Sequence, residues 1–285
     1  MRLPVIILLS VVSVQVSAQN PVSRELKFVF HLVNTDEYED AVYYINTHLN
    51  GTYPLPVRDS LNYLKGWSLY SMKKLSQSAS SLLQVSSNSP FFLKSRFFAA
   101  YNYSYLGLRP VSDQILNDLT LTENLTGLRN FELAGNSLLN RDLSLYNSFI
   151  NKTETNDEYS FSNEKKNFDA YYQKIRQHKN KSMVAGGLLS VILPGSGKIY
   201  AGKTGEGIST FLIVAASGAT AFENIKKAGA SSAKTLLFSS LFGVLYVGNI
   251  FGGVFSVKMA NEEFNHEMDN QILFDMHIPL RNIFD

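Results

Sequence analysis

Two hydrophobic patterns divide the chain. Between about 23 and 150, apolar residues recur at three- and four-residue steps, the pattern of amphipathic helices. The segment 37–49, EYEDAVYYINTHL, shows it at Tyr38, Ala41, Val42 and Ile45. From 183 to 257 charged residues become rare and long uncharged runs take over. The expected fold class is all-α, with helical hairpins followed by a transmembrane helical hairpin.

Three uncharged runs make up the second region, at 183–193, 207–222 and 235–257. A bilayer core requires about 20 helical residues, so the third run is the strongest candidate span and the second is marginal. The first run is too short to cross, and we expect it to dip into one leaflet or lie along it. We define a membrane module at 183–259 and a separate tail at 260–285.

A weak internal repeat lies in the first region. LYSMKKLSQSASSLLQV (69–85) overlays YSYLGLRPVSDQILNDL (103–119) at a shift of 33 or 34 residues. With small residues at Gly66 and Ala79, and Ala41 in an earlier helix, these segments resemble the tetratricopeptide family. The resemblance implies three to four hairpins at 23–150 and a concave face that binds a peptide or protein. The alternative is that the Tyr and Leu stripes are only core.

The N-terminus has the three parts of a secretory signal. Met1-Arg2 is basic, 4–16 is apolar, and Val16-Ser17-Ala18 has small residues where a signal peptidase cleaves. We expect 1–18 to be a signal peptide and the N-terminal domain to be exported. The predicted location is a bacterial cell envelope membrane, with that domain in the periplasm.

A polar segment, 151–182, separates the two regions. We expect a loop to about 160 and then a solvated helix. Its end carries the basic cluster Lys174, Arg176, Lys179 and Lys181. This cluster is either an ordinary solvated helix end or a contact with lipid headgroups.

Composition narrows the possible chemistry. The chain has 26 Lys and Arg against 24 Asp and Glu, so nothing favours nucleic-acid binding. It has no cysteine, which removes disulfides, thiolate metal sites and thiol nucleophiles. The five histidines have no metal-ligand spacing. We therefore expect no catalytic residues, no metal and no cofactor. The expected partners are membrane lipid, an unidentified protein, and a second copy of the chain through the membrane helices.

The most informative motif is a glycine-aromatic turn. The string SVILPGSGKIYAGKTGEGISTFLIV resembles the two-span TM2-domain family and its bacterial relatives. The matching residues are Pro194, Gly195, Gly197, Tyr200, Gly202 and Gly207. The TM2 family has an Asp-Arg-Phe triplet between its spans, where this chain has ENIKKAGASSAK (223–234). The resemblance therefore implies an architecture, a tight turn between apolar helices with Tyr200 as an interfacial anchor, and no specific role.

The same segment also matches a phosphate-binding loop. Residues 197–204, GKIYAGKT, fit G-x-x-x-x-G-K-[ST]. That motif requires a preceding strand and a helix that starts at its Lys-Thr. We expect Gly-Glu-Gly after Thr204 to make a poor first helical turn. Too few residues follow to form a parallel sheet, so a P-loop NTPase is the weakest of our hypotheses.

Small residues within the last span predict how it packs. Gly248 and Gly252 form a small-xxx-small pair that would allow close helix approach. Asn249, the strong amide of this span, is expected to bond a neighbouring helix. Lysines in the connector 223–234 favour a cytoplasmic location for it. Our leading hypothesis is a non-enzymatic, exported, membrane-anchored scaffold that binds a protein through its repeats. The alternative is an oligomeric membrane channel or assembly component.

Overall fold

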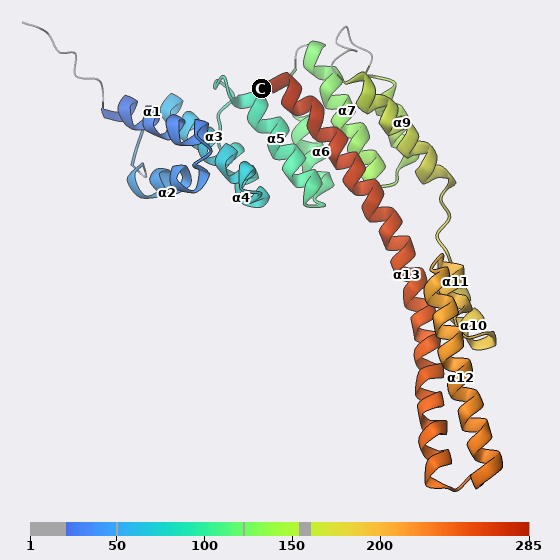
Figure 1. Ribbon diagram of the computed structural model, residues 1–285. Helices are drawn as coiled ribbons and strands as arrows, with labels where there is room; N and C mark the ends of the chain where they lie inside the picture. The colour runs from blue at the N-terminus through green and yellow to red at the C-terminus, as the bar shows by residue number, and fades with distance from the viewer. Residues whose placement is uncertain (1–20, 50, 122, 154–160, 285) are drawn as a thin grey trace, which may run out of the picture. The chain divides into compact units, whose positions relative to one another are not determined.

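A computed structural model describes residues 21–49, 51–121, 123–153 and 161–284 (Figure 1). The predicted signal peptide, 1–18, lies outside these residues. Within them the fold is all-α: thirteen helices and no strand. The chain divides into two compact units at Thr120–Leu121. We describe each unit by itself.

Four helical hairpins lie within the range 23–150. Three belong to the first unit and the fourth begins the second unit. Their helices are α1 (Pro21–Asn34) with α2 (Tyr38–His48), α3 (Leu55–Ser71) with α4 (Leu75–Leu82), α5 (Phe92–Tyr105) with α6 (Arg109–Asn117), and α7 (Glu123–Leu139) with α8 (Leu143–Ile150). The prediction of helical hairpins is confirmed.

All four hairpins turn by the same backbone device. One residue per turn has a positive φ, namely Asp36, Lys73, Gly107 and Arg141, at intervals of 37, 34 and 34 residues. The next residue donates its amide to the carbonyl five positions back, at 2.8, 2.8, 2.8 and 2.9 Å. This is the Schellman motif, which ends a helix and satisfies its last carbonyls. It fixes at 34 the repeat shift between the second and third hairpins.

Small residues bring the paired helices close together. The position five residues after the turn residue is Ala41, Ser78 and Ser112 in the first three hairpins, and all three are fully buried. Ser78 Oγ donates to the Gly66 carbonyl at 2.7 Å and accepts from Asn102 Nδ2 at 3.0 Å. These contacts join the second hairpin to the third.

The fourth hairpin has a large residue at the position five after the turn residue, because a helix outside the hairpins covers it. Its equivalent residue is Tyr146, which is 1% exposed and donates to Asp169 at 2.7 Å. Asp169 belongs to α9 (Ser162–Gln177), whose Phe168 stacks on Phe131 with ring centroids 4.3 Å apart. Helix α9 is polar on one face, as a solvated helix should be, and packs with the other.

The C-terminal region contains two long apolar helices. They follow the short helices α10 (Met183–Ile192) and α11 (Ser196–Ala201), and are α12 (Thr204–Ala228) and α13 (Ala233–Phe284). Both are long and apolar enough to cross a membrane. The segment that we set apart as a tail begins inside α13, since 260–284 continues this helix without a break. No proline interrupts the helix before Pro279, so its hydrogen-bond ladder has no reason to stop at 260.

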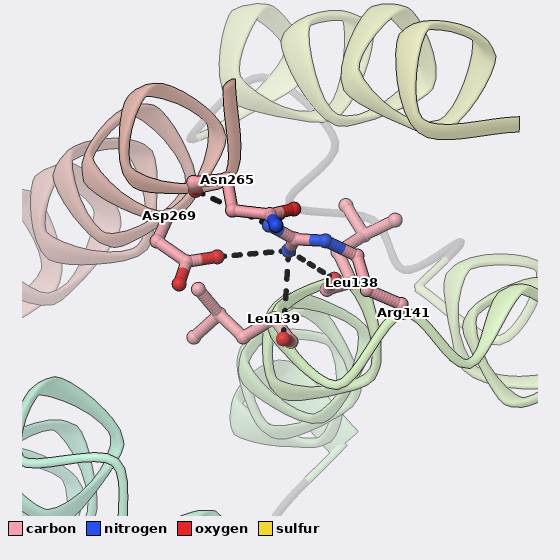
Figure 2. A network of polar contacts seen from close by, with 5 residues as sticks. All are labelled: Leu138, Leu139, Arg141, Asn265 and Asp269. Carbon is pink, nitrogen blue, oxygen red and sulfur yellow. Dashed lines mark hydrogen bonds and ion pairs between the residues drawn. The ribbon is translucent and has the colours of Figure 1, made fainter. Parts of the chain in front are cut away.

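The C-terminal half of α13 is held against the fourth hairpin by a charged network (Figure 2). Arg141 donates to the carbonyls of Leu138 and Leu139, which end α7, at 3.0 and 3.4 Å. Its guanidinium also donates to the backbone and side-chain oxygens of Asn265, at 3.2 Å each, and pairs with Asp269 at 2.8 Å. A single side chain thus caps α7 and fastens α13 to it.

Candidate functional site

The predicted glycine turn forms a compact structure, which we call the glycine junction (residues 182–207 with 246–261 of α13). Helix α10 ends at Ile192, and Gly195 reverses the chain with φ 81°. The short helix α11 follows and ends at Gly202, with φ 100°, before α12 begins at Thr204. Both glycines occupy the left-handed region, where a side chain is strained.

Helix α10 lies antiparallel to α13. A Cβ built on Gly186 would meet Val257 at 2.6 Å and the Gly253 carbonyl at 3.1 Å. Further along α10, Val191 O accepts from the Tyr246 hydroxyl at 2.5 Å. As α10 runs from Gly186 to Val191, its contacts on α13 therefore shift from Val257 to Tyr246, toward the start of α13. Helix α11 then returns in the opposite direction, so α10 and α11 form a short re-entrant pair.

Asn249 satisfies the backbone groups that this reversal exposes. Its Nδ2 donates to Ser190 O at 2.9 Å, and its Oδ1 accepts from the Gly195 amide at 2.7 Å. The side chain is only 4% exposed. A buried, unpaired backbone group costs about 1–3 kcal/mol, so one amide offsets two such costs. The prediction that Asn249 bonds a neighbouring helix agrees with this geometry.

The other glycines of the junction are sites of close backbone approach. A Cβ on Gly197 would overlap the Gly186 carbonyl oxygen and Ser190 Oγ. One on Gly207 would lie 2.5 Å from Ile199 and 2.7 Å from the Gly195 carbonyl oxygen. Gly253 would overlap Ser190 Oγ in the same way. Only hydrogen fits at these positions, because a backbone carbonyl and a neighbouring side chain lie against each of them.

Ser190 Oγ lies at the centre of these contacts. The residue is fully buried, and this hydroxyl has no hydrogen-bond partner among the described residues. The Cα atoms of Gly197 and Gly253 press against it, which allows weak Cα–H···O contacts.

Polar contacts surround the start of α10, at the end of the junction away from the chain reversal at Gly195. Asn261 accepts from the Lys181 amide at 3.0 Å and donates to the Lys181 carbonyl at 2.9 Å. The Tyr200 hydroxyl accepts from the Ser182 amide at 3.3 Å. Lys203 lies 3.9 Å from Glu263. The Asn261 and Glu263 contacts tie this segment to α13 just beyond its apolar part, and the Tyr200 bond holds the start of α10 to α11.

The six residues predicted for the membrane turn all lie in the glycine junction. Gly195, Gly197, Gly202, Gly207 and Tyr200 all take part in the junction, and Pro194 stands at its reversal, half-buried.

The predicted packing pair is not in the closest contact. A Cβ on Gly248 would meet nothing within 4 Å, and one on Gly252 would meet only Lys198, at 3.3 Å. The glycine that packs against α10 is Gly253, which the sequence analysis missed together with Gly186, Tyr246 and Asn261. The spacing 246, 249, 253, 257 would have identified this face, since these positions recur at three- and four-residue steps.

The match to a phosphate-binding loop has a structural explanation. Gly202 ends α11 by the Schellman motif: its amide donates to Ile199 O and the Lys203 amide donates to Lys198 O, both at 2.9 Å. A phosphate loop needs free amides after a strand, whereas here helices precede and fill the loop.

One expectation about this loop was wrong, because α12 does begin at Thr204. The low helix propensity of Gly205 and Gly207 is overridden since Gly207 must approach Gly195 closely.

Two buried carboxyls lie outside the junction. Asp275 accepts from the Tyr171 hydroxyl at 2.8 Å; burial raises the pKa of both groups, and for Tyr171 the bond to Asp275 raises it further. Glu132 is 2% exposed, its Oε1 has no hydrogen-bond partner, and burial raises its pKa well above the usual range. Within the described residues, no three His, Asp or Glu side chains are placed to hold a metal ion.

No family model, no curated protein and no solved structure matches this chain.

Proposed function

We propose that the protein is a non-enzymatic scaffold, anchored in a bacterial envelope membrane by α12 and α13, that binds a protein partner through its helical hairpins. The observation that carries the anchor is the exposure of the apolar helices. Only 11% of the most apolar window of α12 and 22% of that of α13 are buried. A core helix of a soluble protein would be mostly covered, so lipid is the environment that matches these surfaces.

Helix lengths fit a bilayer. At 1.5 Å per residue, the 25 residues of α12 extend about 37 Å, against a hydrocarbon core of about 30 Å. Lys258 is the first charged residue after the apolar part of α13. Asn249 lies nine positions before it, so by the same rise it would lie about 13 Å deep, close to the bilayer centre.

The glycine junction would then be a re-entrant hairpin. A broken helix is tolerated in hydrocarbon only where protein satisfies its freed backbone groups. Asn249 bonds Ser190 O and the Gly195 amide, and Tyr246 bonds Val191 O. These bonds supply what such a hairpin requires. This agrees with the expectation that 183–193 dips into a leaflet.

For the orientation, we place the α12–α13 loop in the cytoplasm and the hairpins outside it. Lys226, Lys227 and Lys234 flank this short loop, and the positive-inside tendency acts on short loops. Long N-terminal domains are translocated largely regardless of charge. Lys198 and Lys203 lie near the start of α12, at the end opposite the α12–α13 loop, and by the same tendency they favour the reverse orientation. Protease accessibility decides between the two orientations.

A polar groove in the first unit supports partner binding. It has a volume of about 370 Å³ and lies among α2, α3 and α4. Its lining residues are Val42, Asn46, Lys65, Leu69, Ser76, Gln77, Ser80, Ser81 and Gln84. Carboxamides both donate and accept hydrogen bonds, as the backbone of an extended peptide requires. We therefore propose an extended peptide segment of the partner as the occupant.

Two measurements test the scaffold. Protease added to intact and to permeabilised cells should cleave 25–150 from the side opposite the α12–α13 loop; a protected domain in the cytoplasm would sink the proposed orientation. A photo-reactive residue at Gln77, in the groove, should crosslink to one defined protein. The matched control is Gln114, an exposed residue of α6 outside the groove. Equal crosslinking from both positions would contradict partner binding in the groove.

Homo-oligomerisation through the membrane helices is the second candidate. It is favoured by Gly248, which is exposed and has open space beside it. A second copy could approach there closely. Gly248→Leu should then shift the detergent-solubilised protein to a smaller species in native mass spectrometry. An unchanged assembly state would count against this function.

A further inference from the structure

The tip of the third hairpin differs from the other three. The residues on either side of the turn residue are Thr35 and Glu37, Met72 and Lys74, Leu106 and Leu108, and Asn140 and Asp142, in chain order. Leu106 and Leu108 are 42% and 49% exposed, and their neighbours Tyr105 and Val111 are 55% and 40% exposed. Among the four turns, the third is therefore the one with an apolar, exposed residue on both sides of the turn residue.

The adjoining tip, that of the second hairpin, is basic. Arg96 of α5 donates to Leu82 O at 3.1 Å, and Asn102 donates to Ser78 Oγ at 3.0 Å. This antiparallel register brings the start of α4 beside the end of α5. The turn that holds Lys73 and Lys74, both exposed, is therefore at the same end of the α4–α5 pair as Tyr105. We call this set the tip patch (Lys73, Lys74, Tyr105, Leu106, Leu108 and Val111).

The sequence around the tip patch has one sign of charge. Residues 60–112 contain no Asp or Glu, and six basic residues: Lys65, Lys73, Lys74, Lys94, Arg96 and Arg109. The first hairpin, by contrast, has Asp36 and Glu37 in its turn. Asp59 and Asp113 stand at the two ends of this segment, and the charged residues of the tip patch itself are Lys73 and Lys74. An anionic surface is therefore the complement of the tip patch.

We propose that the tip patch docks on an anionic lipid surface, with the leucines and Tyr105 inserted among the headgroups and the lysines paired with lipid phosphates. Exposed Leu and Tyr beside Lys is the chemistry of shallow interfacial binding. The inference rests on the proposed membrane anchor, which keeps the hairpins near a bilayer. Tethering makes the second contact intramolecular, so a weak patch suffices.

The absence of cysteine allows a direct test in the full-length protein. We would label L106C with an environment-sensitive fluorophore and reconstitute the protein in phosphatidylcholine vesicles, with or without phosphatidylglycerol. The expected result is blue-shifted emission and protection from aqueous iodide, only with phosphatidylglycerol. Adding Lys73→Gln and Lys74→Gln should lower docking about fivefold per lysine. The matched control is T35C, the equivalent exposed position of the first hairpin, which should stay accessible.

A third label, V247C on the exposed face of α13, separates the inference from its premise. If V247C is protected while L106C is as accessible as T35C, the docking proposal is wrong and the membrane anchor stands. If V247C is accessible too, both are wrong. If L106C is protected without phosphatidylglycerol and despite the lysine substitutions, a protein or a second copy covers the patch, and the proposal is overturned.

Discussion

The hairpin turns and the glycine junction use one backbone device in two settings. All four hairpins end their first helix with a left-handed residue and a Schellman bond, and α11 ends at Gly202 in the same way. In the hairpins the left-handed residue is Asp, Lys or Arg at three of four positions. In the junction both left-handed residues are glycine, and side chains of α13 bond the freed backbone groups.

The difference concerns what surrounds the turn. The turn residues of the first three hairpins are exposed, so a side chain can extend into solvent and water can satisfy leftover carbonyls. In the junction, backbone lies against backbone, and the proposed surroundings contain no water. The same turn therefore tolerates many sequences in the hairpins and few in the junction.

The largest expected effect comes from filling a close approach in the junction. Gly197→Ala places a methyl group against the Gly186 carbonyl and Ser190, and overpacking against backbone should cost about 3 kcal/mol or more. The measurement is the unfolding temperature in detergent, with limited proteolysis of the α10–α12 segment.

Gly205→Ala is the matched control, because nothing lies within 4 Å of a Cβ there. It should be neutral or stabilise by about 0.5–1 kcal/mol, the usual gain of Ala over Gly in a helix. Similar losses in both variants would show that the junction is not closely packed and would remove the contrast with the hairpins.

The second-largest expected loss of stability tests the two hydrogen bonds that the Asn249 side chain makes in the junction. Asn249→Leu keeps the volume and removes both hydrogen bonds, leaving Ser190 O and the Gly195 amide unpaired. We expect a loss of about 2–4 kcal/mol and faster hydrogen exchange of the Gly195 amide. The control is Asn224→Leu, because Asn224 bonds only the Thr220 carbonyl of its own helix. If the two variants unfold alike, the re-entrant pair does not depend on α13.

Much of this fold could be predicted from the sequence, because its signals are local. The three- and four-residue steps identify the hairpins, and the absence of charge over 235–257 identifies the apolar part of α13. The turn glycines could be identified as well, since their order and spacing are specific. These features depend on residues close together in the chain.

The features that the sequence analysis did not identify depend on contacts between distant segments. Gly248 and Gly252 match a packing pattern, but the choice between them and Gly253 depends on where α10 lies. The start of α12 at Thr204 depends on tertiary contact that outweighs helix propensity. The docking of 260–284 depends on Arg141 and Asn265, which are 124 residues apart.

A smaller effect concerns a buried polar group in the hairpin region. Unlike Asn249, Glu132 lacks a partner for one oxygen, and burial raises its pKa. The unfolded chain ionises first, at about pH 4.3, so stability should fall by about 1.4 kcal/mol per pH unit from there up to the folded-state pKa.

Glu132→Gln removes this proton linkage. The variant should gain stability over the natural chain as pH rises, by about 1–3 kcal/mol at neutral pH. Thermal unfolding of both proteins across pH 4–8 measures the difference. Parallel pH profiles would show that the carboxyl is solvated in solution, and Glu37→Gln, at an exposed tip, provides the reference for an accessible site.

The smallest expected effect on stability separates the left-handed turn at Arg141 from the contacts of the Arg141 side chain. Arg141→Gly retains the left-handed conformation, and even favours it, but removes the guanidinium that bonds Leu138 O, Asn265 and Asp269. The network is partly exposed, so its loss should cost about 1–2 kcal/mol net of the backbone gain. Hydrogen exchange over 265–276 of α13 should rise, while exchange in α10 and α11 should stay unchanged.

Lys73→Gly makes the same change at the equivalent turn of the second hairpin, where no such network is attached. Relief of the left-handed strain should stabilise this variant by about 1 kcal/mol. Opposite signs for the two substitutions would show that the turn is a tolerant device and that Arg141 is retained for its contacts with α13. Stabilisation by both would mean that Arg141 contributes nothing beyond the turn, and that α13 is held to the fourth hairpin by apolar packing such as Met276 against Gly135.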